Sequence, residues 1–465
     1  MSTSTPTPPL AERATDEPGR EVPGPGIRAS VTGTLRVRSD PLAWVHEQRA
    51  RFGDVFAARL PRWMPGAPSM LVYACEPVAV REILTDPRRF VKRSPVWDEL
   101  ALGLGNGLLT SEGDVWRGQR RTLQPLFTRR RIADYTDAFL TATEFVGDSW
   151  NGRPDVELVD EMERVTLGSV SRALFGTDVT DEVAPIVHAT DELSALTIRR
   201  GVAPVTTPRW LPTPQNRRLA TLERDLEHRV ERIVDRAASH AGERDDLVSR
   251  LLDAEDPQTG GRLDEREILE QALIFLLAGY DTTSTALAFT LHELGARPDL
   301  QDAVRAEIAR VVGDRRPGPE DAAAMELTRR CLLEAMRLHP PAYITGRSAT
   351  VDTTVAGYRV PAGTVTLTVF GELHRNERFW PDPDRFDPDR FLPEAAADRD
   401  HYAYLPFGGG PRSCIGEHFA MLEATLALAV LLRRWRVATP GGPIPMRYGI
   451  TQRADAPVRA KLQPA

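Results

Sequence analysis

The sequence predicts a mainly helical α+β fold, and three observations along the chain support this. Apolar residues recur at helical spacing through most of residues 77 to 337. Short β-like runs precede that stretch, between Ile27 and Tyr73, and strand and turn chemistry returns after Pro340. The patterns indicate a large helical region and a smaller sheet-rich part, which would form a minor lobe.

The first 26 residues are rich in Pro, Ser, Thr and charged side chains and contain no apolar run. Such a segment cannot bury enough apolar surface to fold, so we expect a flexible leader, with no signal peptide and no membrane anchor. From Ile27 onward, Pro and Gly punctuate short segments, and the run from Asp54 to Leu60 is typical of a strand.

The helical region is interrupted in two places. The Gly-rich stretch from Leu102 to Gly107 predicts a mobile loop, and the segment from Pro204 to Pro214 predicts a second break. After Pro340, residues 357–361 and 365–370 are expected to form strands and turns, and a Pro/Asp/Arg-rich meander follows over residues 380–393.

The most unusual predicted helix runs from Asp264 to Arg297. Asp264 and Glu267 form a capping pair at its start, and Pro298 marks its end. Its centre, residues 272–290, is apolar on every side except for a polar notch at residues 281–285. A membrane span needs roughly 20 uninterrupted apolar residues. The notch therefore favours a helix buried in a protein core.

Composition limits the classes of partner. The chain of 465 residues is 41% hydrophobic and 27% charged, with a net charge of -7 spread over interspersed acids and arginines. This balance argues against nucleic acid and against anionic membranes held by a basic surface. The 3 cysteines lie far apart, so neither a disulfide framework nor a zinc site is indicated, and a reducing cytoplasm fits best.

Residues 407–420, FGGGPRSCIGEHFA, contain the strongest chemical signal. Taken alone, a cysteine is most often a small buried hydrophobe, but the flanking residues change this interpretation. The preceding glycines let the backbone approach a large flat ligand and turn amide N–H groups toward the sulfur of Cys414. A helical pattern begins near Cys414, and a helix N-terminus favours thiolate over thiol. Bound to haem iron, a thiolate promotes O–O cleavage.

The frame FxxGxRxCxG around Cys414 resembles the haem-binding loop of the cytochrome P450 family, and the resemblance extends over most of the chain. It implies the cytochrome P450 fold as one domain over residues 27–465, with haem b between the long helix and this loop and Cys414 as the axial ligand of the iron. It also implies cofactor contacts in the same loop from Phe407, Gly408, Arg412 and Gly416.

Residues 278–283, AGYDTT, resemble the family's oxygen-activation segment. The resemblance implies that Ala278 lies against the haem and that Asp281 and Thr282 relay protons to O₂. From the residues alone, the Thr282 hydroxyl can bond a carbonyl one turn back and bend the helix. A buried Asp281 is costly unless it has a partner or a role in proton transfer.

Glu334 and Arg337, at ExxR spacing, resemble the family's ExxR helix, and residues 386–391 resemble its PxRF segment with Asp in place of the commoner Glu. The i,i+3 spacing puts the two ExxR side chains on one helix face. The resemblance implies that Arg390 joins them in a buried structural network behind the haem. Arg385 is an alternative third member that the sequence leaves open.

Several residues are candidates for the two haem propionates. Trp116 and Arg120, four residues apart, share a helix face and present an N–H donor and a guanidinium together. The resemblance implies that both bind propionate, as do Arg347 and Arg412. His374 lies where the family often has a further contact.

The family's substrate-facing segments correspond to residues 95–110, 190–206, 277–278, 342–345 and 448–451. Their side chains are mainly apolar, and we expect substrate contacts from Trp97, Leu277, Ala278, Tyr343 and Ile344. This lining favours a hydrophobic small molecule, such as a terpenoid, polyketide or fatty acid, that is hydroxylated or epoxidised with one atom of O₂.

The resemblance implies a soluble, monomeric monooxygenase of secondary metabolism. The sequence contains no flavin or dinucleotide fingerprint, so electrons are expected from a ferredoxin or flavodoxin with its reductase. Two alternatives remain: a peroxide-dependent peroxygenase, which the Asp281–Thr282 pair argues against, and a haem sensor without turnover.

Overall fold

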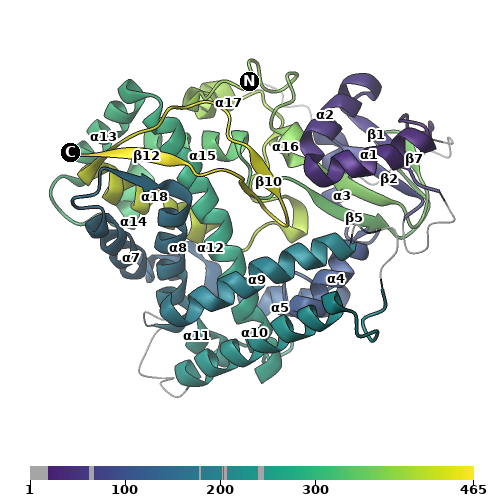
Figure 1. Ribbon diagram of the computed structural model, residues 1–465, viewed down its shortest axis with the longest axis horizontal. Coiled ribbons are helices and arrows are strands. Elements are labelled where there is room, and N and C mark those ends of the chain that lie inside the picture. The colour runs from purple at the N-terminus through teal and green to yellow at the C-terminus, as the bar shows by residue number, and fades with distance from the viewer. Residues whose placement is uncertain (1–18, 62–67, 177–179, 202, 204–206, 239–245) are drawn as a thin grey trace, which may run out of the picture.

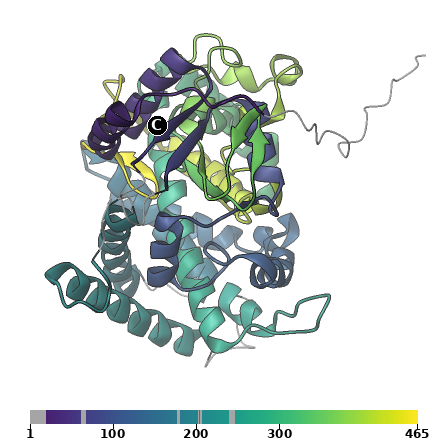
Figure 2. The same cartoon turned by 90° about the vertical axis from the view of Figure 1, so that its right-hand side faces the viewer.

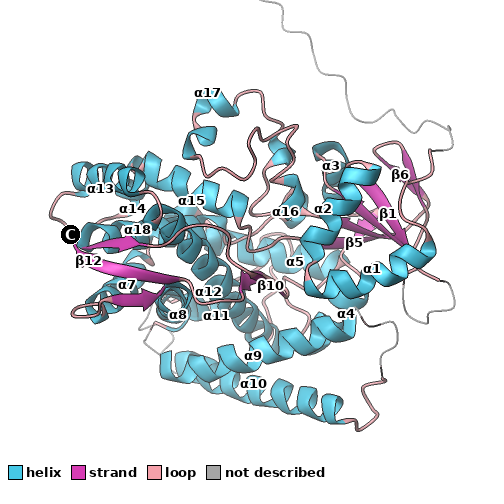
Figure 3. Cartoon of the chain, turned by 45° about the horizontal axis from the view of Figure 1, so that its top comes forward, coloured by secondary structure: helices cyan, strands magenta, loops and turns pink. Residues whose placement is uncertain are grey.

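The computed structural model describes residues 19–61, 68–176, 180–201, 203, 207–238 and 246–465. Helices make up most of them, and the strands gather in small separate groups (Figures 1 and 3). This confirms the predicted mainly helical α+β fold. The helices are α1 (Ile27–Ser39), α2 (Pro41–Phe52), α3 (Pro77–Thr85), α4 (Pro95–Leu104), α5 (Gly113–Leu123), α6 (Arg129–Ala133), α7 (Thr136–Ser149), α8 (Leu158–Phe175), α9 (Thr180–Gly201), α10 (Pro214–Ala238), α11 (Leu247–Asp253), α12 (Glu265–Gly295), α13 (Pro298–Val312), α14 (Pro319–Ala324), α15 (Glu326–Leu338), α16 (Phe370–Leu373), α17 (Pro393–Ala396) and α18 (Glu417–Arg434).

The strands form a larger sheet with order β1-β2-β8-β5-β3 and smaller sheets with orders β4-β12-β9, β10-β11 and β6-β7. They are β1 (Val55–Arg59), β2 (Met70–Ala74), β3 (Phe90–Val91), β4 (Asp155–Glu157), β5 (Thr345–Ala349), β6 (Thr353–Val355), β7 (Tyr358–Val360), β8 (Val365–Thr368), β9 (Trp435–Ala438), β10 (Met446–Tyr448), β11 (Gln452–Ala454) and β12 (Arg459–Pro464).

Contacts with the rest of the fold begin closer to the N-terminus than the sequence predicted. The flexible leader was expected to extend through residue 26, but Arg20 forms a β-bridge with Tyr358 and Val22 is 2% exposed. Burial of an apolar side chain and a backbone pairing fix this segment against the sheet-rich part. Residues 1–18 of the expected leader lie outside the described part of the chain.

Residues 27–52 are helical rather than sheet-rich, which corrects the prediction for the minor lobe. The Asp40 side chain accepts a hydrogen bond from the Ala43 N–H at 3.0 Å, and Pro41 occupies the first turn of α2. Proline there costs no hydrogen bond, because the first N–H groups of a helix have no intrahelical partner. The expected strand within residues 54–60 is present as β1.

The larger sheet joins distant parts of the sequence. β2 pairs with β8 in parallel, with Leu71 opposite Val365, and β8 pairs with β5 in antiparallel. Figure 2 shows the early strands, in purple, beside the late ones, in green. This arrangement fixes the residues of β5, including Arg347, at the edge of the internal cavity described below.

Helix α12 runs through the centre of the molecule (Figure 1). The predicted capping box is present: the Asp264 carboxylate accepts from the Glu267 N–H at 2.8 Å, and the Glu267 carboxylate accepts from the Asp264 N–H at 3.0 Å. The most apolar stretch of α12 is long enough to cross a membrane, yet 78% of it is buried inside the protein. α8 and α15 pack against it. It is thus the buried core helix that the polar notch predicted.

Candidate active site

A cavity of about 1520 Å³ lies between α12 and the loop before α18. The accessible surface of Cys414 faces this cavity. Of the residues predicted from sequence to bind cofactor or substrate or to act on protons, those lining the cavity are Trp97, Leu277, Ala278, Asp281, Thr282, Tyr343, Ile344, Arg347, Phe407, Gly408, Arg412, Cys414 and Gly416. The structure therefore brings together residues separated by more than half the chain.

The loop that carries Cys414 has a glycine-dependent conformation. The Cys414 N–H donates to the Phe407 carbonyl at 2.8 Å, which closes the loop. Gly408 and Gly410 have φ of 70° and 69°, in the left-handed region that favours glycine. A Cβ on Gly410 would lie 2.2 Å from the Leu84 carbonyl oxygen. At this position a glycine is needed for packing against α3 as well as for the turn.

Cys414 precedes the first residue of α18, Glu417, rather than beginning the helix. Burial raises the pKa of the Cys414 thiol above its ordinary value, while the Gly416 N–H that donates to the sulfur, and the Arg120 charge, lower it. The local dipole and N–H groups thus do not by themselves make the sulfur a thiolate. A bound metal ion does so, because a coordinating thiol is deprotonated outright.

Positive charge is in excess at one side of the cavity. Arg347, Arg412 and Lys92 all line it, and Glu112, 2.6 Å from Arg412 Nη2, is the acid paired with them. Arg412 Nη1 is buried without a hydrogen-bond partner. Burial, followed by repulsion from Arg412, lowers the pKa of Arg347 to about 10, and burial lowers the pKa of Lys92.

This excess fits haem. Lys92, Arg347 and Arg412 have Glu112 as their acid, and Arg120 adds a further positive charge beside Arg412, so the cations outnumber the acid. The two propionates of haem would neutralise part of this excess. Lys92 was not predicted from the sequence, because a lone lysine after β3 gives no local signal. Its ammonium also lies 3.9 Å from the centre of the Trp97 ring.

Two predicted propionate ligands, Trp116 and Arg120, contact the Cys loop. The Trp116 ring stacks under the Arg412 guanidinium at 4.2 Å, and Arg120 Nη1 donates to the Ser413 carbonyl at 3.1 Å. His374, a further predicted candidate, has its own partner in the core. Its Nε2 accepts the Leu405 N–H at 3.0 Å, and burial, with repulsion from Arg337 and Arg375, lowers its pKa to about 3. It is a neutral core residue.

The polar notch of α12 opens toward the cavity. The Thr282 hydroxyl donates to the Ala278 carbonyl at 2.7 Å, one turn back, as predicted. Asp281, 9% exposed, has a partner that the sequence did not reveal: Arg453 Nε lies 2.5 Å from its Oδ1, and the Thr451 hydroxyl donates to its other oxygen. Burial raises the pKa of Asp281 above its ordinary value.

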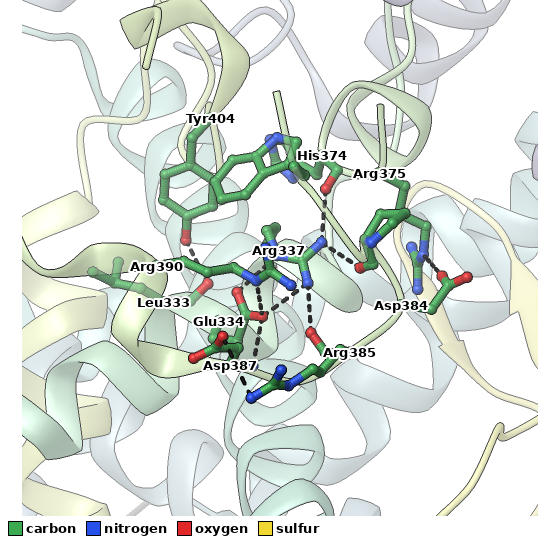
Figure 4. A network of polar contacts seen from close by, with 12 residues as sticks. Leu333, Glu334, Arg337, His374, Arg375, Asp384, Arg385, Asp387, Arg390 and Tyr404 are labelled. Atoms are coloured by element: carbon green, nitrogen blue, oxygen red, sulfur yellow. Dashed lines mark hydrogen bonds and ion pairs between the residues drawn. The ribbon is translucent and has the colours of Figure 1, made fainter. Parts of the chain in front are cut away.

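Behind the cavity, Arg337 is the centre of a closed network (Figure 4). Its Nε and Nη2 donate to the two Glu334 oxygens at 2.7 and 2.8 Å, and both side chains are 0% exposed. The same guanidinium donates to the carbonyls of His374, Pro383 and Arg385.

The structure assigns the third member of this network, its second cation, to Arg390. Arg390 Nε lies 3.4 Å from Glu334 Oε1, whereas the Arg385 side chain is 69% exposed and contacts Asp387 at 3.9 Å. Arg390 also donates to the carbonyls of Pro381 and Asp382. These bonds hold the meander of residues 380–393 against α15.

The wall on the substrate side is mainly apolar. Leu277 and Ile344 contribute aliphatic surface, the Trp97 Nε1 donates to the Gly346 carbonyl at 3.2 Å, and the Tyr343 hydroxyl donates to the Gly449 carbonyl at 3.1 Å. The rings therefore face the cavity with their polar atoms already bonded. Of the expected segment 190–206, residues 202 and 204–206 lie outside the described residues.

An accessible cysteine on a glycine-rich loop, a cation surplus beside it and an acid–alcohol pair across the cavity define a haem-thiolate site. Comparison with known proteins agrees: the family model "Cytochrome P450" matches residues 31–460. The chain belongs to the cytochrome P450 family, its cofactor is haem, and it is a monooxygenase.

Individual relatives match over nearly the whole chain. A cyclooctat-9-en-7-ol 5-monooxygenase of Streptomyces melanosporofaciens is 35% identical over 95% of this chain and 97% of its own. A pentalenene oxygenase of Streptomyces avermitilis is 33% identical over 89% of this chain and 90% of its own. The solved cytochrome P450DA heme domain superposes with a TM-score of 0.85 at 28% identity, covering 97% of this chain and 99% of that one.

Proposed function

We propose that this monooxygenase inserts one atom of O₂ into a terpenoid, as a hydroxylation or an epoxidation. The observation that carries the proposal is the apolar part of the cavity lining, formed by Leu277, Ile344, Ile450 and the rings of Trp97 and Tyr343. Such a lining selects by shape and favours a hydrocarbon skeleton with few polar groups. The relatives named for cyclooctat-9-en-7-ol and pentalenene support the terpenoid class over fatty acids and polyketides.

Different residues of the chain would have different roles in the reaction. Haem bound through Cys414 supplies the site at which O₂ binds and its O–O bond is cleaved. Arg347, Arg412 and Lys92 would hold the propionates. Asp281 and the Thr282 hydroxyl, which both line the cavity, would hold and pass protons there.

Electrons would come from a separate protein. A ferredoxin, or a flavodoxin, with its reductase is the partner we propose, because no flavin or dinucleotide fingerprint occurs in the sequence. We further propose a monomer in the cytoplasm. The burial of α12 inside the protein and the net negative charge of the chain support the cytoplasmic placement.

The test is an optical titration of the purified ferric protein with terpenoids, fatty acids, steroids and macrolides. A low-spin to high-spin shift with terpenoids, followed by an oxygenated product detected by mass spectrometry with NADPH and a surrogate ferredoxin chain, is the expected result. A shift and product with another class alone would overturn the terpenoid proposal. Product formed only with added peroxide would establish the peroxygenase alternative, and ligand binding without product in either assay would establish the sensor.

Cys414→Ala tests the haem ligand, and Cys331→Ala is its matched control. The Cys414→Ala variant is expected to lose the thiolate signature of the reduced carbon monoxide complex. Cys331→Ala removes a buried cysteine remote from the cavity lining and should keep that signature.

A further inference from the structure

Helix α4 lies beside α9, and its two sides have different neighbours (Figure 3). One side faces the cavity, and its large apolar residues there, three and four positions apart, are Trp97, Leu100 and Leu104. Glu99 and Gly103, also four positions apart, lie on another side. A Cβ on Gly103 would lie 3.3 Å from a methyl group of Leu193, so this second side faces α9. The contacts of the second side therefore decide where the cavity-facing side lies.

Glu99 is the carboxylate of this second side, and two arginines share it. Arg200, in the last turn of α9, binds it through two hydrogen bonds, from Nε to Oε2 at 2.9 Å and from Nη2 to Oε1 at 3.0 Å. Arg209, in the connection between α9 and α10, donates to Oε2 at 2.9 Å. A two-pronged pair of this kind fixes orientation as well as distance. One side chain thus joins α4 to α9 and to the connection that follows it.

The two arginines are also held by other groups. Arg200 Nη1 donates to Asn216 Oδ1 at 2.9 Å, and the Asn216 amide in turn donates to two carbonyls of the connection. Arg209 pairs with a second acid, Glu223 of α10. Two arginines and two acids make the network electrically balanced. It therefore has no need of a bound ion to hold α4 in place.

The centre of the network is shielded from solvent. The side chains of Arg200 and Glu99 are 5% and 14% exposed. Salt screens partly buried pairs of this kind much less than exposed ones. The neighbouring acid of α4, Asp98, lies 3.5 Å from Arg93, but these two side chains are 53% and 62% exposed. Glu99 can thus fix the position of α4, whereas an exposed pair such as that of Asp98 contributes little.

The backbones of α4 and α9 also meet directly. A Cβ on Gly201, the last residue of α9, would lie 2.6 Å from Val96 Cα. Because no layer of side chains separates the two helices at this point, a shift at the end of α9 moves α4 with it. α4 has only 10 residues, and an isolated helix of that length is marginal in water. Its position therefore depends on these contacts.

From this arrangement we infer that Glu99 is a positioning residue for the substrate. By fixing α4 against α9, it sets where Trp97, Leu100 and Leu104 hold a hydrocarbon skeleton, and so it selects which carbon is oxygenated. Glu99 touches neither substrate nor cofactor and acts only through α4. The inference rests on the proposed function, because it takes the apolar cavity lining to be the surface that the substrate contacts.

The choice of carbon is sensitive to small displacements of this surface. A misplacement of about 1 Å can cost about 100-fold in the rate at the intended atom. An apolar lining holds a hydrocarbon by shape, with few polar groups to fix its orientation. When α4 is loosened, several carbons of the substrate can reach the reacting position, and the product becomes a mixture.

The test is Glu99→Gln, with Asp98→Asn as the matched control on the same helix. Glutamine keeps the length of the side chain but loses its charge and one of its two acceptor oxygens. The variant is expected to keep its haem content and thiolate signature. KM should rise roughly tenfold with kcat changed less than about threefold, and new regioisomers should appear beside the main product. The control should give the wild-type KM and product pattern.

A second variant covers the case in which Glu99→Gln fails to fold, because that change also removes the carboxylate of the buried Arg200. Arg209→Gln keeps the pair of Arg200 with Glu99 and breaks only the link from α4 to the connection. It should show the same change in products to a smaller extent. Glu99→Asp, which keeps the charge, should restore part of the wild-type product pattern.

Azole binding to the ferric protein makes the result independent of the terpenoid proposal. Imidazole is too small to need the α4 side of the cavity, whereas the three aromatic rings of clotrimazole need its apolar surface. In optical titrations, Glu99→Gln should weaken clotrimazole roughly tenfold more than imidazole.

Equal effects on the two azoles overturn the inference, as does an unchanged product pattern in folded Glu99→Gln or, if that variant does not fold, in Arg209→Gln. A matching change in Asp98→Asn overturns it as well. Failure to oxygenate any terpenoid would overturn the proposed function and leave the azole titrations to decide on Glu99.

Discussion

Two arginines of this protein, the buried Arg337 and the partly exposed Arg453, have opposite surroundings. Arg337 is 0% exposed and has one carboxylate, Glu334, with carbonyl oxygens taking its remaining N–H groups. Every N–H group of Arg337 has a hydrogen-bond acceptor, so this arrangement is fixed. Arg453 is shared by three carboxylates, those of Asp191, Asp281 and Glu163. This second arrangement leaves negative charge to be balanced by protons, so it can change its protonation without changing the fold.

The largest expected effect comes from opening the network of Arg337. Arg337→Ala would remove both guanidinium hydrogen bonds from the buried Glu334 carboxylate and leave it with Arg390, 3.4 Å away, as its cation, at a cost of up to about 3–5 kcal/mol in the free energy of unfolding. Chemical denaturation, with haem release as a second signal, measures this loss. Arg385→Ala, at an exposed side chain of the same meander, should change stability by less than about 0.5 kcal/mol. Similar losses in the two variants would show that the network is not the structural element described here.

The cluster around Arg453 should respond in activity rather than in stability. Asp281→Asn removes the inner carboxylate but leaves Arg453 paired with Asp191. We expect product formation to fall about 100-fold, while the melting temperature stays within a few degrees of wild type. Single-turnover kinetics beside a thermal melt would check both parts. A large loss of stability with unchanged kinetics would show that Asp281 has a structural role rather than a role in the reaction.

Thr282→Ala sharpens the comparison at the cavity end of the cluster. The hydroxyl is bonded to the Ala278 carbonyl within the helix, so its removal should cost little stability and leave haem in place. Coupling of NADPH electrons to product should fall by roughly tenfold, with peroxide as the diverted product. Unchanged coupling would remove Thr282 from the proton route.

The smallest expected effect is on the pH dependence of the protein's stability. Because the pKa of Glu163 rises from 4.5 to about 7 on folding, the folded state binds the extra proton between these values. Its stabilising contribution is complete below about pH 4.5 and is lost as the pH rises through about 7. Glu163→Gln should flatten this part of the curve of melting temperature against pH. A curve identical to that of wild type would place the cluster's proton on another carboxyl.

What could be predicted from the sequence was local. The capping box of α12, its polar notch and the Cys414 loop were evident because each depends on residues close in sequence. The pairing of Glu334 with Arg390 needed the structure to exclude Arg385, since both arginines lie in one meander. The helices α1 and α2 were both missed. For α2 the reason is that proline at a helix start gives the same signal as proline in a turn.

The partners of the buried charges could not be predicted. Asp281 was expected to need a partner, but Arg453 lies in another region of the chain, on a short strand with no distinguishing pattern. Lys92 likewise joins Arg347 and Arg412 only after β3 and β5 pair. Trp116 and Arg120 have the spacing expected of a carboxylate site, yet their helix places them against the Cys loop.

The hydrogen bond between Tyr343 and the Gly449 carbonyl has a consequence for enzyme design. Tyr343 also packs edge-on against Tyr448, and the Gln452 N–H donates to the Pro341 carbonyl at 2.9 Å. The pocket wall and the hairpin of Arg453 are therefore one mechanical unit. Variants that enlarge the pocket at Tyr343 would also loosen the hairpin that carries Arg453, the partner of Asp281. A library made there to broaden the substrate range should therefore also be screened for NADPH consumption that yields no product. Tyr343→Phe keeps the ring and isolates the contribution of that single bond.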